Sequence, residues 1–276
     1  MDNLYNIKIG DIIQGEKFQQ LEDNKTIYYC HTHDVNNFFK NINFTHDFIL
    51  ISHNSDGKIT NNPGPTARKG EEKRFYEKGI CYDADVKNIP KNLKKWYGQN
   101  IEYKNDLIIP IPIGLENSYN FPHLHKIEKL FSIRNINKKF KNLVYLNFNI
   151  MNNPKERQSI YNMLKNEKYV TVEYGRNGLD YNNYLNNLHN HCFMICPPGN
   201  GLGVHQPWES LYIGTIPIQK KTINNSGWRD LPFCWVDSWE QLKDETFLRN
   251  EYIRITSHKY DLSKLTFNYW KKRILN

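Results

Sequence analysis

The chain has 276 residues, of which 39% are hydrophobic, so it can form one large domain or two modest ones and needs no disulfides to fold. Its net charge of +8 suits a phosphorylated ligand, nucleic acid or an anionic membrane surface, but the basic residues are spread along the chain and do not choose among these partners. The five cysteines lack metal-ligand spacing, and there is no signal-peptide pattern or apolar run of about 20 residues, which excludes a zinc ribbon, a disulfide scaffold and a membrane span and favours a cytoplasmic location.

Short β-rich runs alternate with helical segments in the first half of the chain. Strands are predicted at residues 26–34, 47–56 and 106–117, each ending in polar residues. A helix is predicted at 35–42 and a second one within 86–100, where Pro90 suits the first helical turn. This alternation indicates an α/β fold with functional loops at the strand ends.

The second half repeats the alternation more strictly. Strands are predicted at residues 142–150, 169–175, 191–198 and 215–219, and helices at 153–166, 179–190 and 205–214. Asn153 and Pro154 favour the start of one helix, and Gly214 ends another. Strand and helix in turn are typical of a doubly wound parallel sheet.

Two Rossmann-like units are therefore expected. A polar and basic stretch near residue 135 separates them, so we place the first unit at 1–135 and the second at 136–255. Residues 256–276 are predicted to form an amphipathic helix that packs back across both units and returns toward the first. The apolar face of this helix is formed by Leu262, Leu265, Trp270 and Ile274.

One stretch, Cys196–Gln219, has the form of a strand, a glycine-rich turn, a helix and a second strand. Glycines let the backbone approach a phosphate, and the N-terminus of a helix carries partial positive charge. His205 lies in the first turn of that helix, and Glu209, one turn later, can accept two hydrogen bonds from a ribose. The stretch has neither the GxGxxG dinucleotide pattern nor the P-loop GK[ST], so a nucleotide site and a purely structural turn are both open.

The sequence "FMICPPGNGLGVHQPWESLYIGTIPIQKK", together with the later "LPFCWVDSWEQL", resembles the donor-domain signature of exostosin-like glycosyltransferases. The upstream "SHNSDG" and "IPIGLEN" are similar to the acceptor-side half of small exostosin-like proteins of large DNA viruses and some bacteria. Membership of this family implies a GT-B fold, in which two Rossmann-like domains face a cleft. The family usually has an arginine in "HRxWE", where this chain has Gln206 followed by Pro207.

The resemblance also implies an activity. A sugar would pass from a nucleotide-diphosphate sugar to a hydroxyl of a glycan or glycoprotein acceptor, with inversion at the anomeric carbon and with no metal, other cofactor or nucleic acid. Stabilising the leaving diphosphate needs backbone N–H groups and cationic side chains, with Glu209 on the ribose. Candidates for donor binding are Arg157, Gly199, Asn200, Gly201, His205 and Glu209.

An inverting mechanism needs a base beside the acceptor hydroxyl. Asp56 and His53 both follow the apolar part of the strand at 47–56, and Asp56 is preferred because a carboxylate in a partly dry cleft can have its pKa raised toward neutrality. Each also suits a plain structural role in a turn or loop. Candidates for acceptor binding are Asp34, Gly114, Glu116 and Asn117.

Two other interpretations remain open. Asp83 and Asp85 form a DxD, which metal-dependent GT-A glycosyltransferases use to hold a divalent ion and a diphosphate. The nucleotide-like turn lies more than a hundred residues later, which argues against that assignment. The basic charge and the 14% of aromatic residues would also suit a non-catalytic carbohydrate-binding or nucleic-acid-binding protein.

Overall fold

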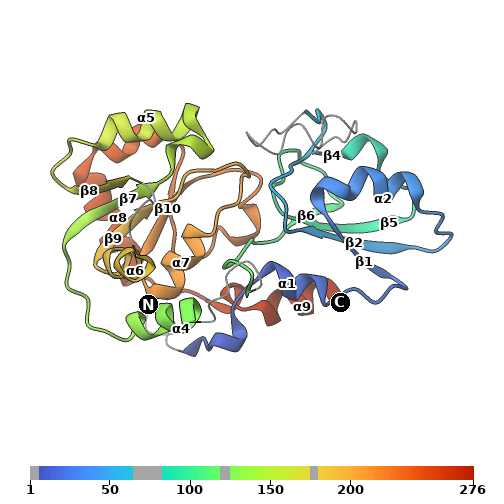
Figure 1. The fold of residues 1–276 in the computed structure, drawn as a ribbon, viewed down its shortest axis with the longest axis horizontal. Helices are drawn as coiled ribbons and strands as arrows, with labels where there is room; N and C mark the ends of the chain where they lie inside the picture. Colours follow the sequence, from blue (N-terminus) through green and yellow to red (C-terminus); the bar gives the residue numbers. More distant parts are fainter. Residues whose placement is uncertain (1–5, 65–82, 119–124, 175–179) are drawn as a thin grey trace.

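The computed structural model describes residues 6–64, 83–118, 125–174 and 180–276, which form a mixed α/β fold (Figure 1). Each half of the chain contributes one larger sheet, and both of these sheets are parallel throughout. The predicted α/β class with parallel sheets is confirmed, and the architecture is compatible with Rossmann-like units. No helix in these described ranges is long and apolar enough to cross a membrane.

The first sheet has the strand order β1-β2-β5-β6. Its strands are β1 (Ile27–His31), β2 (Phe48–His53), β5 (Leu93–Gly98) and β6 (Ile108–Pro110), and the short strands β3 (Ile59–Thr60) and β4 (Ala84–Asp85) form a separate pair. Each strand of the larger sheet is added on the same side of the one before it, so the order never reverses. The loops that leave the carboxyl ends of these strands carry Asp56, Asn100 and Glu116.

Strand β5 corrects the sequence analysis, because the helix predicted within 86–100 is wrong. Pro90 precedes the strand, and the side chains of Trp96 and Tyr97 enter the cores on opposite faces of the sheet. Successive side chains of a strand point to opposite faces of the sheet, so a strand between β2 and β6 can bury both of these aromatic residues. Pairing with two strands therefore overrides the helix signal around Pro90.

The second sheet has the order β11-β10-β9-β7-β8. Its strands are β7 (Asn142–Phe148), β8 (Val170–Tyr174), β9 (His191–Ile195), β10 (Ile216–Lys220) and β11 (Cys234–Val236). The chain starts in β7, adds β8 on one side, and then adds β9, β10 and β11 on the other. The strand order reverses between β7 and β9, where the loops at the carboxyl ends diverge and leave a crevice.

Helices cover both faces of the second sheet (Figure 1). Helices α5 (Pro154–Leu164) and α8 (Glu245–Ser257) pack on one face, and α4 (His125–Arg134), α6 (Tyr181–His189) and α7 (Gln206–Ile213) pack on the other. Helix α4 contacts α6 and α7. Helix α4 therefore packs with the helices of the second sheet, and the boundary at residue 135 stays a prediction.

A single hydrophobic core connects the two units. Helices α1 (Gly15–Gln19) and α2 (Val35–Asn41) pack on opposite faces of the first sheet, and α9 (Phe267–Leu275) lies beside α1 (Figure 1). Phe18 of α1, Leu211 of α7 and Trp270 of α9 all belong to this shared core. The Tyr97 hydroxyl donates to the Arg273 carbonyl at 2.7 Å, so the C-terminal helix is hydrogen-bonded to the first sheet.

Candidate functional site

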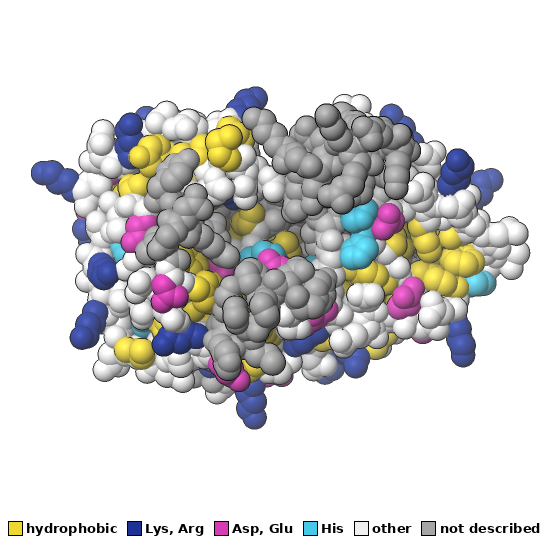
Figure 2. All heavy atoms as spheres, viewed as in Figure 1, with side chains coloured by type: hydrophobic (Ala, Val, Ile, Leu, Met, Phe, Trp, Pro, Cys, Tyr) yellow, Lys and Arg dark blue, Asp and Glu magenta, His cyan; other side chains and the backbone are white. Residues whose placement is uncertain are grey.

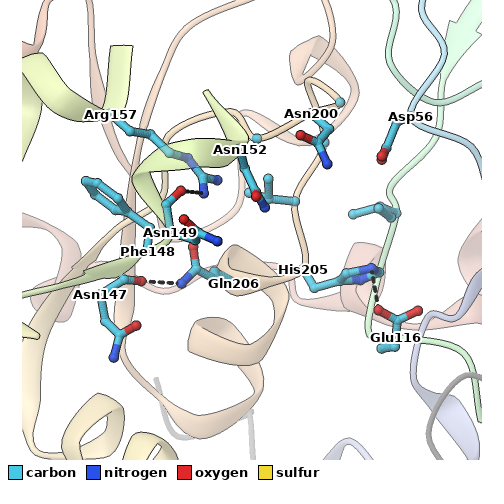
Figure 3. A pocket seen from close by; sticks show the side chains of 15 residues that line it. Asp56, Glu116, Asn147, Phe148, Asn149, Asn152, Arg157, Asn200, His205 and Gln206 are labelled. Atoms are coloured by element: carbon cyan, nitrogen blue, oxygen red, sulfur yellow. Dashed lines mark hydrogen bonds and ion pairs between the residues drawn. The ribbon is translucent and has the colours of Figure 1, made fainter. Parts of the chain in front are cut away.

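A cavity of about 400 Å³ lies at the reversal point of the second sheet. Three parts of the second unit line it, and these are the carboxyl end of β7 with the residues after it, the side chain of Arg157, and the turn at 199–206. The first unit contributes Asp56, Ile113 and Glu116 (Figure 3). Seven of the predicted site residues line this cavity, namely Asp56, Glu116, Arg157, Gly199, Asn200, Gly201 and His205.

Arg157 is held inside the wall of the cavity. Helix α5 begins at Pro154, so Arg157 lies one turn from its start, and it is only 4% exposed. Its guanidinium donates to the carbonyls of Pro198 and Asn149 at 2.8 Å each, and to that of Pro197 at 3.2 Å. Burial lowers its pKa to about 10, which leaves it charged at neutral pH. Arg157 therefore holds the turn in place through these carbonyl contacts. The sequence predicts a different role for it, the binding of phosphate oxygens.

Two glycines of the turn after β9 lie close against side chains. A Cβ on Gly199 would lie 3.1 Å from Nη2 of Arg157, and one on Gly201 would lie 2.8 Å from Nδ2 of Asn100. The backbone N–H of Gly203 donates to Oδ1 of Asn100 at 2.7 Å. The turn is therefore packed between Arg157 and a residue of the first unit, while the exposed Asn200 lies at the cavity (Figure 3).

His205 precedes α7 and faces the first unit. Its Nδ1 lies 2.8 Å from the Gly114 carbonyl oxygen, and its Nε2 lies 3.3 Å from a carboxylate oxygen of Glu116 (Figure 3). A doubly protonated imidazole can donate to both oxygens at once. Gly114 has a φ of 71°, and a Cβ there would lie 2.2 Å from the Ile13 carbonyl oxygen, so this position requires glycine.

Gln206 has a definite partner at the position where the family pattern has arginine. Its Nε2 donates to the Asn147 carbonyl at 2.6 Å, which ties the start of α7 to the end of β7 (Figure 3). The amide is neutral, so Gln206 brings no charge to the cavity. Arg157 lies on the wall that the second unit forms. Among the described residues that line the cavity, it is the side chain that stays positively charged at every working pH.

Asp56 lies on the opposite wall of the cavity from Arg157 (Figure 3). It follows β2 in the loop "HNSDG", and its residue is half-buried. The neighbouring Ser55 carbonyl accepts hydrogen bonds from the side chains of Gln99 and Asn100 at 2.5 and 2.8 Å. Its loop is therefore anchored to the carboxyl end of β5, which fixes where the Asp56 carboxylate can lie.

His53 does not reach the cavity, and its assignment as a base is corrected. The side chain is fully buried, it stacks on Phe18 with ring centroids 5.1 Å apart, and burial lowers its pKa to about 4. Nδ1 accepts the Asn54 backbone N–H at 2.8 Å, so Nε2 carries the proton and donates to the Pro112 carbonyl at 3.1 Å. His53 holds the loop in place and has no access to a substrate hydroxyl.

Glu209 also lies outside the cavity lining. It is 4% exposed, and its two carboxylate oxygens accept hydrogen bonds from the hydroxyls of Tyr184 at 2.7 Å and Tyr181 at 3.3 Å. These contacts join α7 to α6. We therefore do not assign the donor ribose to Glu209.

Two further candidates for acceptor binding, Asp34 and Asn117, make contacts within the protein. Asp34 is paired with His33 at 3.4 Å and does not line the cavity. Asn117 is 6% exposed, accepts the Glu16 backbone N–H at 2.9 Å and donates to Oδ1 of Asn54 at 2.9 Å. Asn117 therefore connects α1 to the loop that carries Asp56.

The DxD aspartates bind backbone N–H groups. Asp83 is 4% exposed and accepts from the N–H of Lys58 at 2.8 Å and of Gly64 at 3.3 Å, while Asp85 accepts from the N–H of Lys87 at 2.9 Å. Neither residue lines the cavity. Within the part of the chain that the structure describes, no group of three or more His, Cys, Asp and Glu side chains is arranged to hold a metal ion.

One cavity wall, at the carboxyl end of β7 and in the residues after it, was not predicted from the sequence. Phe148, Asn149 and Asn152 line it, as does Asn147 at the end of the strand. The signal was available, because polar residues at the carboxyl end of the first strand of a doubly wound sheet face its crevice. Asparagine is so common in this chain that three asparagines around the end of a strand do not stand out.

Comparisons with known proteins add no family assignment. A scan against protein-family models found no match, and a search of curated proteins found none either.

Proposed function

We propose that this protein is a GT-B glycosyltransferase, which moves a sugar from a nucleotide-diphosphate sugar to an acceptor hydroxyl with inversion. The observation that carries the proposal is the position of Asp56. This carboxylate of the first unit lines the same cavity as the glycine-rich turn at the reversal point of the second sheet. Phosphate-bearing ligands commonly bind at such a point, and a base across from them completes the requirement for transfer.

The donor side is assigned to the second unit. The diphosphate would lie along the turn at 199–201 and the N-terminus of α7, whose partial positive charge favours anions. Arg157 adds positive charge at one end of the turn, and His205 lies at the other end. The charge of Arg157 is fixed by its carbonyl contacts, so it acts over a short distance without reorganising.

The acceptor side is assigned to the first unit. Asp56 accepts the proton of the acceptor hydroxyl while the hydroxyl oxygen attacks the anomeric carbon from the face opposite the diphosphate. The bond between the anomeric carbon and the diphosphate oxygen breaks, and its electron pair leaves with the diphosphate. Glu116, on the same wall, is placed to accept hydrogen bonds from sugar hydroxyls.

The charges around the cavity argue against a nucleic-acid ligand there. Figure 2 shows Lys and Arg side chains around the rim of one face, with His and acidic side chains nearer its middle. The cavity itself contains two carboxylates, Asp56 and Glu116. A nucleic-acid surface instead needs basic side chains gathered along one track.

Ligand-induced stabilisation tests the donor site. We expect uridine or guanosine diphosphate, at about 100 times its Kd, to raise the melting temperature by roughly 5 °C. The increase should be the same in excess EDTA and in magnesium. A response that EDTA abolishes would favour the metal-dependent alternative with Asp83 and Asp85, and tight binding of single-stranded nucleic acid with no response to any nucleoside diphosphate would contradict the proposal.

Turnover tests the base. Asp56→Asn should lower kcat by roughly 10²–10⁴-fold with an unchanged thermal shift from the donor nucleotide, because the amide cannot accept the proton. Asp34→Asn is the matched control, since Asp34 is an acid at the end of the neighbouring strand and lies outside the cavity. Full activity in Asp56→Asn would remove Asp56 as the base.

A further inference from the structure

Asn100 has an unusual backbone and complete burial. It follows β5 at the carboxyl end of the first sheet, has a φ of 60° and is 0% exposed. Residues other than glycine rarely adopt positive φ, although asparagine does so more readily than most. A side chain that is retained in such a conformation and fully buried points to a role for its carboxamide.

The carboxamide of Asn100 joins the two walls of the cavity. Its Nδ2 donates to the carbonyl of Ser55, the residue directly before Asp56, at 2.8 Å. Its Oδ1 accepts the backbone N–H of Gly203, in the turn of the second unit, at 2.7 Å. One planar group of fixed size therefore sets the spacing between the loop of Asp56 and the phosphate-facing turn.

The contact requires an amide at this position. One end of the side chain must donate and the other must accept, which aspartate and leucine cannot both do. The fit is also close, because a Cβ on Gly201 would lie 2.8 Å from Nδ2 of Asn100 and one on Gly203 would lie 3.3 Å from its Oδ1. Gly201 and Gly203 thus make room for the side chain of Asn100.

We infer that Asn100 is a positioning residue, which aligns the Asp56 carboxylate of the first unit with the donor turn of the second. The inference rests on the proposed function. Proton transfer and attack at the anomeric carbon depend on this alignment, whereas donor and acceptor binding each depend on one wall. Loss of the tie should therefore lower kcat more than it raises either KM, and should let water compete with the acceptor.

Asn100→Asp is the closest substitution in shape. It keeps an acceptor for the Gly203 N–H but places a carboxylate oxygen against the Ser55 carbonyl. We expect kcat to fall roughly 10- to 100-fold with each KM within about threefold of the wild-type value. We also expect the ratio of donor hydrolysis to sugar transfer to increase.

Gln99→Glu is the matched control. Gln99 donates to the same Ser55 carbonyl at 2.5 Å and accepts the Asn54 N–H at 3.1 Å, so both of these contacts stay within the first unit. The same change from amide to acid should weaken the hold on Ser55 but leave Gly203 in place. Its hydrolysis-to-transfer ratio should therefore lie nearer the wild-type ratio than that of Asn100→Asp.

Hydrogen exchange checks the tie without any substrate. Asn100→Gly keeps the positive φ and removes the carboxamide, so the Gly203 amide should exchange faster than in the wild type. Unchanged exchange at Gly203 would overturn the tie itself. If the wild type transfers sugar and the folded Asn100→Asp variant keeps the wild-type kcat and hydrolysis ratio, the positioning role alone is wrong. If the wild type neither binds nucleoside diphosphates nor turns over, the proposed function is wrong and the positioning role with it.

Discussion

His53 ends β2 with its imidazole fully buried, stacked on Phe18 and hydrogen-bonded through both nitrogens. Burial lowers its pKa to about 4, whereas an unfolded chain titrates near 6.5. The folded protein therefore binds the proton less tightly than the unfolded protein. His189 and His191 are also buried, and burial lowers the pKa of each.

These histidines predict a loss of stability in mild acid. The contribution of His53 is fully present above pH 6.5 and is lost as the pH falls toward 4, by roughly 3 kcal/mol at the end of that range. Urea unfolding at a series of pH values should show this decrease, and His53→Gln should flatten it while lowering stability at pH 7. His258→Gln, at an exposed histidine, should keep the wild-type slope; an equal slope in His53→Gln would contradict the assignment.

Much of the residue-level site could be predicted, and the limit was long-range contact. Gly199, Gly201 and His205 were identified because a glycine-rich turn between a strand and a helix has a local pattern. The burial of His53 depends on Phe18 and Pro112, which lie 35 and 59 positions away along the chain. Nothing near His53 in the sequence distinguishes an enclosed imidazole from one that faces a substrate.

At the scale of elements, Arg157 connects helix α5 to the turn before α7. Its three hydrogen bonds to carbonyls have directions that a planar guanidinium satisfies together. Lysine would keep the charge but lose this geometry. The conformation of the turn therefore depends on α5 as well as on β9.

Arg157→Lys should separate charge from geometry. We expect it to lower the free energy of unfolding by roughly 1–3 kcal/mol, because carbonyls in the wall lose their donors. The thermal shift with nucleoside diphosphate should also decrease, since the turn is no longer held. Arg249→Lys, at an exposed pair with Glu245 on α8, should stay within about 0.5 kcal/mol of the wild type; equal losses in the two variants would show that Arg157 acts only as a surface charge.

Every strand and helix predicted between residues 142 and 219 is present, whereas β11 and α8 were not predicted and the first half was predicted less well. Local sequence decides where some helices begin and end. Helix α5 begins after Asn153 at Pro154, and helix α7 ends at Gly214, which has a φ of 84°. Strand β5 could not be recognised, because its identity comes from pairing with β2 and β6. The packing of α4 on α6 and α7 likewise depends on contacts between elements and has no local signal.

At the scale of the whole molecule, the shared core couples the two sheets. Trp270 is 1% exposed and Ile274 is 0% exposed, and both lie in the same core as residues of α1, α4 and α7. Trp270 also packs edge-on against Trp228 of the second unit, with ring centroids 6.3 Å apart. Helix α9 thus stabilises both units together.

This coupling predicts a single unfolding transition. Trp270→Ala should lower the free energy of unfolding by roughly 3–5 kcal/mol and shift the transitions seen by far-UV circular dichroism and by tryptophan fluorescence together. Lys271→Ala, one position along and exposed, should leave both transitions in place. Two separate transitions, of which Trp270→Ala moves only one, would show that the units fold independently.

The position of α9 in the chain also constrains how the protein is made. A ribosome releases the strands of both sheets before it releases α9, yet α9 supplies side chains to the core that encloses Phe18 near the other end of the chain. The first unit therefore keeps one apolar face open to solvent until α9 has been synthesised. During that interval the nascent chain is exposed to chaperones and to aggregation.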